Sequence, residues 1–319
     1  MGVKIGYYAI TDTWTPTECV QQAREAERIG FDAVWVEDHL IAMPGGQQCN
    51  FAWTVMSSAL QATERVPFVT GVTAPIMRYH PAIVAQAFAT MGAMYPGRVG
   101  IGVGTGEPPN EMAVRGGEWP SNATRLDMLE EALTIMNRLW TSAEPVSFAG
   151  RYYTLNSAVV LTRPEEKVPV YVSAIGPGAA KLAGRLGDHL VSIANNPQYI
   201  KEELFPTFEA AAREAGKDPK TMERAVNIQY IYDPEQVVPF ESIQQDAGTI
   251  SGGALSRAMS SGPISLFHSA EDIIKKIEEL NRMRYDHIAI GNNTPGYTAA
   301  GLDADLSLKI WEDVFPHVR

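Results

Sequence analysis

Three side chains in the first third of the chain could move a proton: Asp38, His39 and Glu107. Histidine is the side chain whose unperturbed pKa lies closest to neutrality, so His39 is the best candidate for a general acid or base. Glu107 follows a short apolar segment, Val99–Val103, and stands beside Gly106 in a loop where a flat ligand could approach the backbone. Two titratable groups of different type suit a reaction that moves protons at two places.

Each of these residues also has a plain structural interpretation. A backbone carbonyl can hold a histidine, an aspartate can cap a helix, and a glutamate at a strand-to-helix turn can simply be solvated. The His, Asp and Glu residues lack the spacing of metal ligands, and the sequence holds no Gly-x-Ser-x-Gly motif of a serine hydrolase. We therefore expect no metal site and no serine nucleophile.

Eight apolar, β-rich segments alternate with amphipathic helical segments. The predicted strands are Val3–Tyr8, Ala33–Val36, Phe68–Thr73, Val99–Val103, Val168–Ser173, His189–Ile193, Ala225–Tyr232 and one that includes Ile288–Ile290. Strict alternation favours a parallel sheet, and eight units close a barrel. The sequence therefore predicts a (β/α)8 TIM barrel with insertions, forming a single domain over residues 1–319. The Ser/Gly-rich segment 233–267 is expected to be an irregular insertion.

In a barrel of this kind, chemistry is found where the strands end, on the face built by the strand-to-helix loops. The residues that follow the predicted strands include Asp12, Asp38, His39, Thr73, Ala74, residues 105–110, residues 174–178, Asn195, Asn196, Asn292 and Asn293. Residues 176–181 open a helix directly after a strand, where free backbone amides could hold a phosphate. An ordinary N-terminal turn is the alternative for that segment.

The composition is that of an ordinary globular protein, with 319 residues, of which 45% are hydrophobic and 20% charged. A net charge of −11 argues against a nucleic-acid partner and against an anionic membrane surface, because both attract clustered Lys and Arg. Cys19 and Cys49 are the only cysteines, so no disulfide framework is expected. The first residues have the pattern of a strand rather than a signal peptide. We expect a cytoplasmic protein with no membrane partner.

Several segments are similar to one known family. They are Asp38-His39 and residues 74–91, 95–111, 117–120 and 180–184. Together they resemble the coenzyme F420 (deazaflavin)-dependent oxidoreductases of the bacterial-luciferase-like superfamily, over about 1–232 and 268–319. Within that family the likeness is nearest to the secondary alcohol dehydrogenases and then to the glucose-6-phosphate dehydrogenases. The resemblance implies an insertion-bearing (β/α)8 barrel, usually a homodimer, that holds F420 at the strand C-termini and acts on a small molecule.

The resemblance also implies which residues hold the cofactor. Asp38 would contact the deazaflavin, and Gly71 and Val72 would be joined by a cis peptide bond behind its ring. Further implied contacts are Ala74, Thr105, Gly106 and Asn110, with Ile175, Gly176, Gly178 and Ala179 at the cofactor's phosphate. Backbone amides in that last segment would let an acidic protein bind an acidic cofactor.

His39 and Glu107 match the family's catalytic pair. In the implied reaction, His39 takes the hydroxyl proton as a hydride leaves the carbinol carbon for C5 of the deazaflavin, and Glu107 handles the proton at the cofactor's N1 side. A deazaflavin carries carbon where a flavin carries nitrogen, so it behaves as a hydride carrier and supplies the difficult step. The reaction could run in either direction.

Departures from the family concern the substrate. Met43 stands where the alcohol and sugar-phosphate enzymes carry a tryptophan, Asn196 where the sugar-phosphate enzymes carry a lysine, and Pro263 aligns with their arginine. A phosphate without charged partners binds poorly, so glucose 6-phosphate is disfavoured. The segment 233–267 is also shorter than the matching insertion of the alcohol dehydrogenase. The residues expected to line the substrate pocket are Asp12, Met43, Asn195 and Asn196.

Other activities within the superfamily remain open at this point. The reduced cofactor could reduce a C=N or C=C bond, as in methylenetetrahydromethanopterin reductases, or the barrel could hold FMN as a luciferase-like monooxygenase. A barrel that binds a cofactor without chemistry is a further alternative, against which the presence of Asp38, His39 and Glu107 argues. The prediction is an F420-dependent dehydrogenase or reductase of an alcohol or small carbonyl compound, with FMN as the alternative cofactor.

Overall fold

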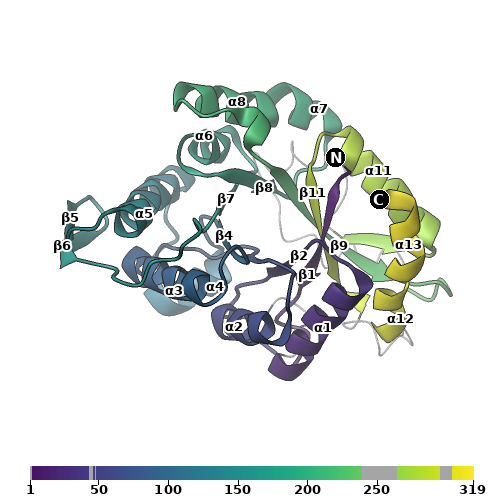
Figure 1. Ribbon diagram of the computed structural model, residues 1–319. Helices are drawn as coiled ribbons and strands as arrows, with labels where there is room; N and C mark the ends of the chain where they lie inside the picture. The colour runs from purple at the N-terminus through teal and green to yellow at the C-terminus, as the bar shows by residue number, and fades with distance from the viewer. Residues whose placement is uncertain (1, 43–45, 47, 239–263, 295–303) are drawn as a thin grey trace.

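A closed barrel of parallel strands organises the molecule (Figure 1). The computed structural model describes residues 2–42, 46, 48–238, 264–294 and 304–319. The barrel strands are β1 (Lys4–Ala9), β2 (Ala33–Val36), β3 (Phe68–Thr70), β4 (Val99–Val103), β7 (Val170–Ser173), β8 (His189–Ser192), β9 (Arg224–Tyr232) and β11 (His287–Asn292). Each pairs in parallel with its neighbour, and the pairing of β11 with β1 closes the ring. The predicted (β/α)8 TIM barrel is confirmed.

Helices surround the barrel as an outer layer (Figure 1). They are α1 (Pro16–Ile29), α2 (Ala52–Ala62), α3 (Pro81–Met94), α4 (Pro108–Arg115), α5 (Asn122–Thr141), α6 (Pro177–Leu186), α7 (Pro197–Tyr199), α8 (Phe205–Glu214), α11 (Ala270–Arg282), α12 (Ala304–Lys309) and α13 (Trp311–Val318). A π-helical turn, Ile200–Leu204, joins α7 to α8, and a 3-10 turn, Pro219–Thr221, precedes β9. None of the described helices is both long and apolar enough to span a membrane.

Local sequence signals fix where these helices begin and end. Helix α1 starts in a capping box, in which the Thr15 side chain and the Glu18 side chain each accept a backbone N–H of the other residue. It ends at Gly30, whose φ of 114° is a left-handed conformation that glycine adopts readily. Helix α3 starts with Pro81, where the missing N–H removes no helical hydrogen bond.

Alternating strand residues fill two apolar layers. Side chains that point inward form a small cluster inside the barrel, where the rings of Trp35 and Tyr171 lie 5.0 Å apart. Their neighbours Val34 and Val36 point outward into the larger core beneath the helices. The interior of the barrel is therefore packed below the level at which the strands end, which leaves the strand ends for a binding site.

The N-terminal end of the barrel, which we call the floor, holds a polar cluster around Glu223. Its carboxylate accepts a hydrogen bond from the Tyr171 hydroxyl (2.7 Å), lies 3.4 Å from Nδ1 of His287 and pairs with Nζ of Lys4. Nε2 of His287 accepts a hydrogen bond from the indole N–H of Trp35 (3.1 Å), which leaves the ring proton on Nδ1. Burial alone would raise the pKa of Glu223, but the bonds from His287, Lys4 and Tyr171 outweigh it and hold that pKa well below its usual value.

One strand lies in the segment that the sequence predicted to be irregular. Residues 264–267 form β10 (Ile264–Phe267), which pairs in parallel with Gln229–Tyr232 of β9. Within β9, strand β8 pairs only with Arg224–Val226, so the second half of the long β9 offers an edge that β10 covers. Residues 239–263 of the predicted insertion lie outside the described part of the chain. A small antiparallel hairpin, β5 (Val146–Ala149) with β6 (Thr154–Ala158), projects beside α5.

Candidate active site

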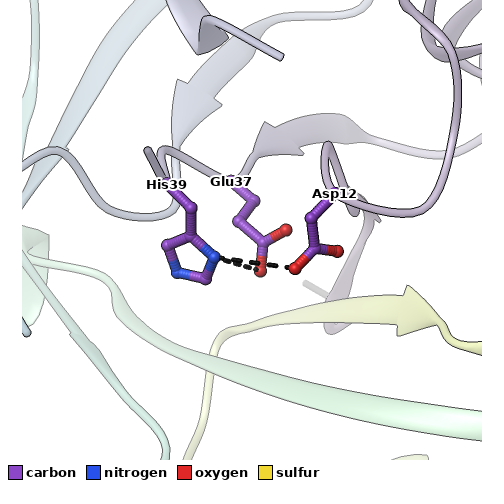
Figure 2. A group of neighbouring side chains, drawn as sticks. All are labelled: Asp12, Glu37 and His39. Atoms are coloured by element: carbon purple, nitrogen blue, oxygen red, sulfur yellow. Dashed lines mark ion pairs between the residues drawn. The ribbon is translucent and has the colours of Figure 1, made fainter. Parts of the chain in front are cut away.

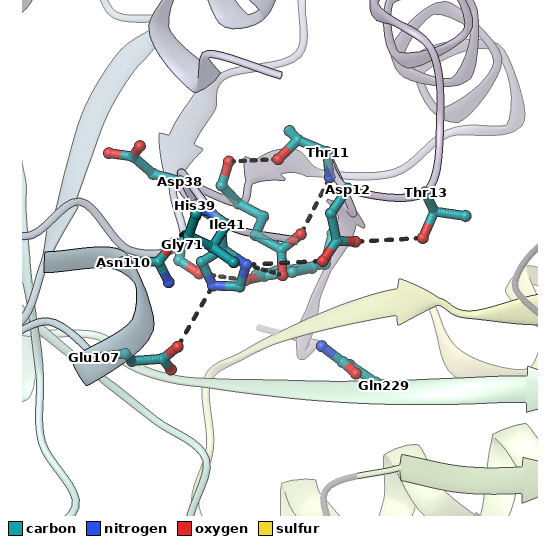
Figure 3. A network of polar contacts seen from close by, with 12 residues as sticks. Thr11, Asp12, Thr13, Asp38, His39, Ile41, Gly71, Glu107, Asn110 and Gln229 are labelled. Atoms are coloured by element: carbon teal, nitrogen blue, oxygen red, sulfur yellow. Dashed lines mark hydrogen bonds and ion pairs between the residues drawn. The ribbon is translucent and has the colours of Figure 1, made fainter. Parts of the chain in front are cut away.

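Loops at the C-terminal end of the barrel, which we call the mouth, bring the candidate acid–base groups together (Figure 3). Asp12 follows β1, His39 follows β2, and Glu107 directly precedes α4. Nε2 of His39 lies 3.8 Å from Oε2 of Glu107, while Nδ1 lies 3.9 Å from Oδ2 of Asp12. The Glu107 side chain is 54% exposed and that of Asp12 only 5%. The imidazole therefore stands between a buried carboxylate and an open one.

A further carboxylate, that of Glu37, lies on the buried side of the ring (Figure 2). Its Oε1 is 3.5 Å from Nδ1 of His39, and its side chain is 3% exposed. Its Oε2 accepts the backbone N–H of Thr11 (3.2 Å), and the Thr11 hydroxyl donates to the Glu37 carbonyl (3.2 Å). Nδ1 of His39 is buried and makes no hydrogen bond of ordinary length. Its attraction to Glu37 and Asp12 is therefore mainly that of charge across short distances.

The surroundings of His39 favour its protonated form. Burial by itself lowers the pKa of His39, but the negative charges of Glu37, Asp12 and Glu107 outweigh burial and raise it to about 9. Burial also raises the pKa of Glu37 to about 7, because the nearby His39 charge offsets only part of that effect and Asp12 adds to it. The carboxylates thus favour the protonated ring, and the charge of that ring in turn opposes the protonation of Glu37.

The ligand atoms of Asp12, Glu37 and His39 all lie within 4.8 Å of one another, close enough to surround a single cation. Their separation along the sequence does not follow a metal-ligand spacing, so the sequence did not predict the grouping. A protonated imidazole already supplies a positive charge to this cluster, and Figure 2 shows its Nδ1 edge turned toward both carboxylates. The absence of a metal site stays a prediction.

Asp38 turns away from this cluster (Figure 3). Its carboxylate accepts hydrogen bonds from the Thr73 hydroxyl (2.6 Å) and the Tyr79 hydroxyl (3.0 Å), and lies 3.2 Å from the guanidinium of Arg78. The side chain is 0% exposed. The Arg78 guanidinium also donates a hydrogen bond to the Asp38 carbonyl (2.8 Å). The predicted contact of Asp38 with the deazaflavin stays a prediction.

Arg78 is shared between Asp38 and Glu111, a residue in the first turn of α4. Its Nε lies 3.3 Å from Oε2 of Glu111, and both side chains are almost fully buried. Burial raises the pKa of Glu111 to about 7, against the lowering effect of Arg78. The guanidinium of Arg78 is therefore committed to carboxylates other than those around His39.

Asn110 ties the loop after β2 to helix α4. Its Oδ1 accepts the backbone N–H groups of Leu40 (2.7 Å) and Ile41 (2.9 Å). The side chain is buried, and Glu107 is the N-cap residue of the same helix. One carboxamide oxygen thus fixes the spacing between the segment that carries His39 and the segment that carries Glu107.

The peptide bond between Gly71 and Val72 is cis, at the end of β3. The Gly71 carbonyl accepts a hydrogen bond from the Tyr8 hydroxyl, and a Cβ on Gly71 would lie 2.6 Å from Cε2 of Tyr8, so the site has room only for glycine. Ala74 is buried two residues beyond Val72. The side chain of Asn227, from β9, lies beside Gly71, and its Oδ1 is buried without a hydrogen-bond partner. Among the described residues, this buried acceptor is left without a donor.

Helix α6 presents an open N-terminus after β7. Its N-cap, Gly176, offers no side chain, and Pro177 follows as the first helical residue. The first intrahelical bond joins the N–H of Ala180 to the Gly176 carbonyl, so the amides of Gly178 and Ala179 come before it. The preceding Ile175 is held through its carbonyl, which accepts the Tyr199 hydroxyl (2.7 Å). Such a helix start binds phosphate groups well.

Thr105 and Gly106 lie in the loop between β4 and α4, and both are partly exposed. Gly106 has a φ of 71°, and a Cβ there would lie 2.5 Å from Cγ of Glu111. Glycine is therefore required to bring this backbone close to the helix start. The loop stays open to a ligand on the side of Glu107.

The residues predicted for the substrate pocket have different surroundings. Asp12 belongs to the His39 cluster, and Asn195 is buried at the end of β8. Asn196 is the N-cap of α7, where its Oδ1 accepts the N–H groups of Gln198 (3.1 Å) and Tyr199 (3.4 Å). Met43 lies outside the described residues. The pocket assignment of these residues stays a prediction.

Sequence reasoning missed three charged residues of the mouth: Glu37, Arg78 and Glu111. Glu37 directly precedes the Asp38-His39 pair, so its position at a strand end was a usable signal. Arg78 and Glu111 lie within the segments that carry the family resemblance, but only the fold shows that they are buried and face each other. In each case the missing information was the direction of the side chain.

The chain is similar in sequence to known F420-dependent enzymes. Over 244 residues, the chain is 40% identical to an F420-dependent glucose-6-phosphate dehydrogenase of Kribbella flavida, covering 76% of this chain and 73% of that one. A second protein of the same name, from Amycolatopsis mediterranei, is 35% identical over 283 residues, or 88% and 80% of the two chains. These relatives confirm the resemblance to F420-dependent oxidoreductases predicted from the sequence.

Solved structures agree with the fold. An F420-dependent secondary alcohol dehydrogenase, determined in complex with an F420-acetone adduct, is 40% identical, with a TM-score of 0.86 and full coverage of both chains. A coenzyme F420-dependent tetrahydromethanopterin reductase from Methanopyrus kandleri shares the fold at 20% identity, with a TM-score of 0.75 and full coverage of both chains. The family model described as luciferase-like monooxygenase matches residues 4–239, and the protein belongs to that family.

Proposed function

We propose that this protein transfers a hydride between coenzyme F420 and an alcohol or small carbonyl compound. F420-dependent oxidoreduction is the activity of its relatives at 35–40% identity. The observation that carries the proposal is the pair at the mouth, in which Nε2 of His39 lies 3.8 Å from Oε2 of Glu107. Two proton-carrying groups at the ends of two barrel strands suit the oxidation of an alcohol or its reverse.

The mouth fits a large, anionic, planar cofactor such as F420. Gly71 and Val72 would lie behind the ring, and Asp38 would contact the deazaflavin. Further contacts would come from Ala74, Thr105, Gly106 and Asn110. The unpaired Oδ1 of Asn227 beside Gly71 would find a donor there. The start of α6, with Ile175, Gly176, Gly178 and Ala179, would hold the phosphate through backbone amides.

The protein's own groups would move the proton. When bound, F420 accepts or supplies a hydride at C5 of the deazaflavin. Nε2 of His39 takes the hydroxyl proton during alcohol oxidation and returns it to the carbonyl oxygen during reduction. Glu107, which is open to the mouth, would handle the proton at the cofactor's N1 side. Burial of Asp12 and Glu37 keeps water from the far side of the ring.

The substrate class follows from the charges at the rim. Several relatives are named glucose-6-phosphate dehydrogenases, but the candidate phosphate position, Asn196, is neutral and its Oδ1 is used to cap α7. A sugar phosphate needs cationic partners, and the guanidinium of Arg78 is already committed to Asp38 and Glu111. A small, uncharged secondary alcohol, or the ketone made from it, requires no such partner.

The test is a substrate panel followed by the loss of the visible absorbance of oxidised F420. We expect turnover with 2-propanol and not with glucose 6-phosphate, and we expect Glu107→Gln to lose about 10²-fold or more in kcat while it still binds F420. Turnover of glucose 6-phosphate alone would contradict the substrate, and full activity of Glu107→Gln would contradict its role. Titration with FMN separates the monooxygenase alternative, because only the true cofactor binds stoichiometrically.

Assembly and location extend the proposal. By analogy with the family, the protein would work as a homodimer in the cytoplasm. Gel filtration with light scattering tests the dimer directly, and a monomer that turns over its substrate would contradict it. Reduction of a C=N or C=C bond is the alternative chemistry, and the panel should include such acceptors with reduced F420.

A further inference from the structure

The side of His39 that faces away from the mouth is unusually rich in negative charge. Glu37 from the end of β2 and Asp12 from the end of β1 both face Nδ1, at 3.5 Å and 3.9 Å. Both side chains are nearly fully buried, so water screens them poorly. Buried carboxylates at this distance favour the protonated form of a histidine, because they offset the cost of burying its charge.

The other groups packed around the ring do not balance this charge. Glu107 faces Nε2, the Tyr8 hydroxyl is committed to the Gly71 carbonyl, and Cys49 is a neighbouring thiol whose pKa burial raises. Arg78 is held by Asp38 and Glu111. On the described residues, therefore, the positive charge that Glu37 faces at close range is that of the imidazolium itself.

We propose that Glu37 is the positioning residue of His39: its buried carboxylate faces Nδ1, directs Nε2 toward the mouth and stabilises the protonated ring, so that the ring enters carbonyl reduction as a proton donor. The backbone N–H of Thr11 holds Oε2 of Glu37, which leaves Oε1 for the ring. The inference rests on the proposed function, because it assumes that His39 exchanges a proton with the substrate.

The step balances as a reduction. The Nε2–H bond of His39 breaks and an O–H bond forms on the carbonyl oxygen, while the carbonyl carbon gains the hydride that reduced F420 supplies. The substrate becomes an alcohol and the cofactor is oxidised, and Glu107 would take the proton that the oxidised cofactor releases at its N1 side. The neutral ring then regains a proton from water through the open side at Glu107, with Glu37 again favouring the charged form.

The test is the titration of His39 itself, measured by 15N NMR of histidine-labelled protein without cofactor and assigned with a His39→Asn variant. Glu37→Gln removes the charge but keeps an oxygen for the Thr11 N–H. We expect its His39 pKa to fall by about 1–3 units, the range for loss of an opposite charge at this distance. The pH above which carbonyl reduction declines should fall by the same amount in kcat/KM.

Matched variants separate charge from shape. Glu37→Asp keeps the charge and should retain most of the wild-type pKa of His39. Glu111→Gln removes another buried carboxylate of the mouth, one that faces Arg78, and should leave the His39 titration within a few tenths of a unit of wild type. If Glu37→Gln does not fold, Asp12→Asn gives an independent reading, with a smaller shift in the same direction.

The proposal is overturned if the His39 titration is unchanged in Glu37→Gln or, where that variant does not fold, in Asp12→Asn. It is also overturned if Glu111→Gln shifts the titration equally. Failure of the proposed function would be seen separately, as wild-type protein that does not bind F420 or does not transfer hydride to a carbonyl compound. The NMR titration uses no cofactor, so each idea can fail while the other stands.

Discussion

The barrel carries a histidine beside glutamate at each of its two ends, and the two pairs have opposite surroundings. At the floor, both ring nitrogens of His287 have partners, and the Glu223 carboxylate has three. At the mouth, Nδ1 of His39 has no hydrogen bond of ordinary length and faces Glu37 and a second carboxylate. The floor lowers the pKa of its glutamate, whereas the mouth raises both the histidine and the glutamate pKa.

The difference separates a structural use of the same residue types from a chemical one. A fully hydrogen-bonded network stabilises the fold, and removing or adding a proton there would break one of its hydrogen bonds. A cluster with unequal charges and an open side at Glu107 can gain or lose a proton when a ligand arrives. Residue type alone would not have distinguished them, since both histidines follow or begin a barrel strand.

Replacing each histidine by asparagine gives the strongest test of the difference between the mouth and the floor. His39→Asn should lose about 10²–10⁴-fold in kcat, because the acid–base group is removed, while its melting temperature changes little. His287→Asn should lower the melting temperature through the lost bonds to Trp35 and Glu223, while folded protein keeps its turnover. Thermal unfolding and F420 absorbance measure the two effects. Equal loss of stability in both variants would remove the distinction.

The variant Glu223→Gln tests how much the polar cluster at the floor stabilises the fold. The change leaves Lys4 and His287 without their anion and should lower the free energy of unfolding by about 2 kcal/mol at pH 7. Since the folded pKa of Glu223 is depressed, its contribution is present above about pH 4.3, the pKa of an unfolded glutamate, and is lost as the pH falls below that value. Urea unfolding at pH 7 and pH 3 tests this, because the variant should differ from wild type at pH 7 and approach it at pH 3.

The pH dependence of turnover tests the role of His39 as the group that exchanges a proton with the substrate. Alcohol oxidation needs the neutral form of His39, whose pKa is raised to about 9, so its kcat/KM should rise about tenfold per pH unit between pH 7 and 9. Carbonyl reduction needs the protonated ring and should fall above about pH 9. Rates measured in both directions decide the sign. A rate of oxidation independent of pH over that range would contradict protonation of this ring.

Much of the frame could be predicted from the sequence. The periodicity of the apolar segments places every barrel strand, and the glycine and proline signals place the ends of α1 and α3. Strand β10 could not be predicted, because its four residues adjoin a Ser/Gly-rich segment and form a strand only where β9 has a free edge. That edge is a property of the closed barrel and of no local pattern.

The sequence could predict which residues lie at the rim of the barrel, but not the direction in which their side chains point. His39 and Glu107 could be placed on one rim because they follow barrel strands. The sequence could not show that Asp38 turns outward to Thr73 while Glu37, its neighbour, turns inward to the ring. Successive residues at the end of a strand point to opposite sides, and the register that decides which side is which comes from the whole sheet.

The bridge made by Asn110 limits how this scaffold can diverge. Because one oxygen grips the backbone amides of Leu40 and Ile41, an insertion or deletion in either flanking loop would displace the proton donor and its acidic neighbour together. Changes that alter substrate preference are therefore more easily accommodated in loops that Asn110 does not contact. We therefore expect related proteins with the same chemistry to keep the lengths of both loops that these hydrogen bonds join.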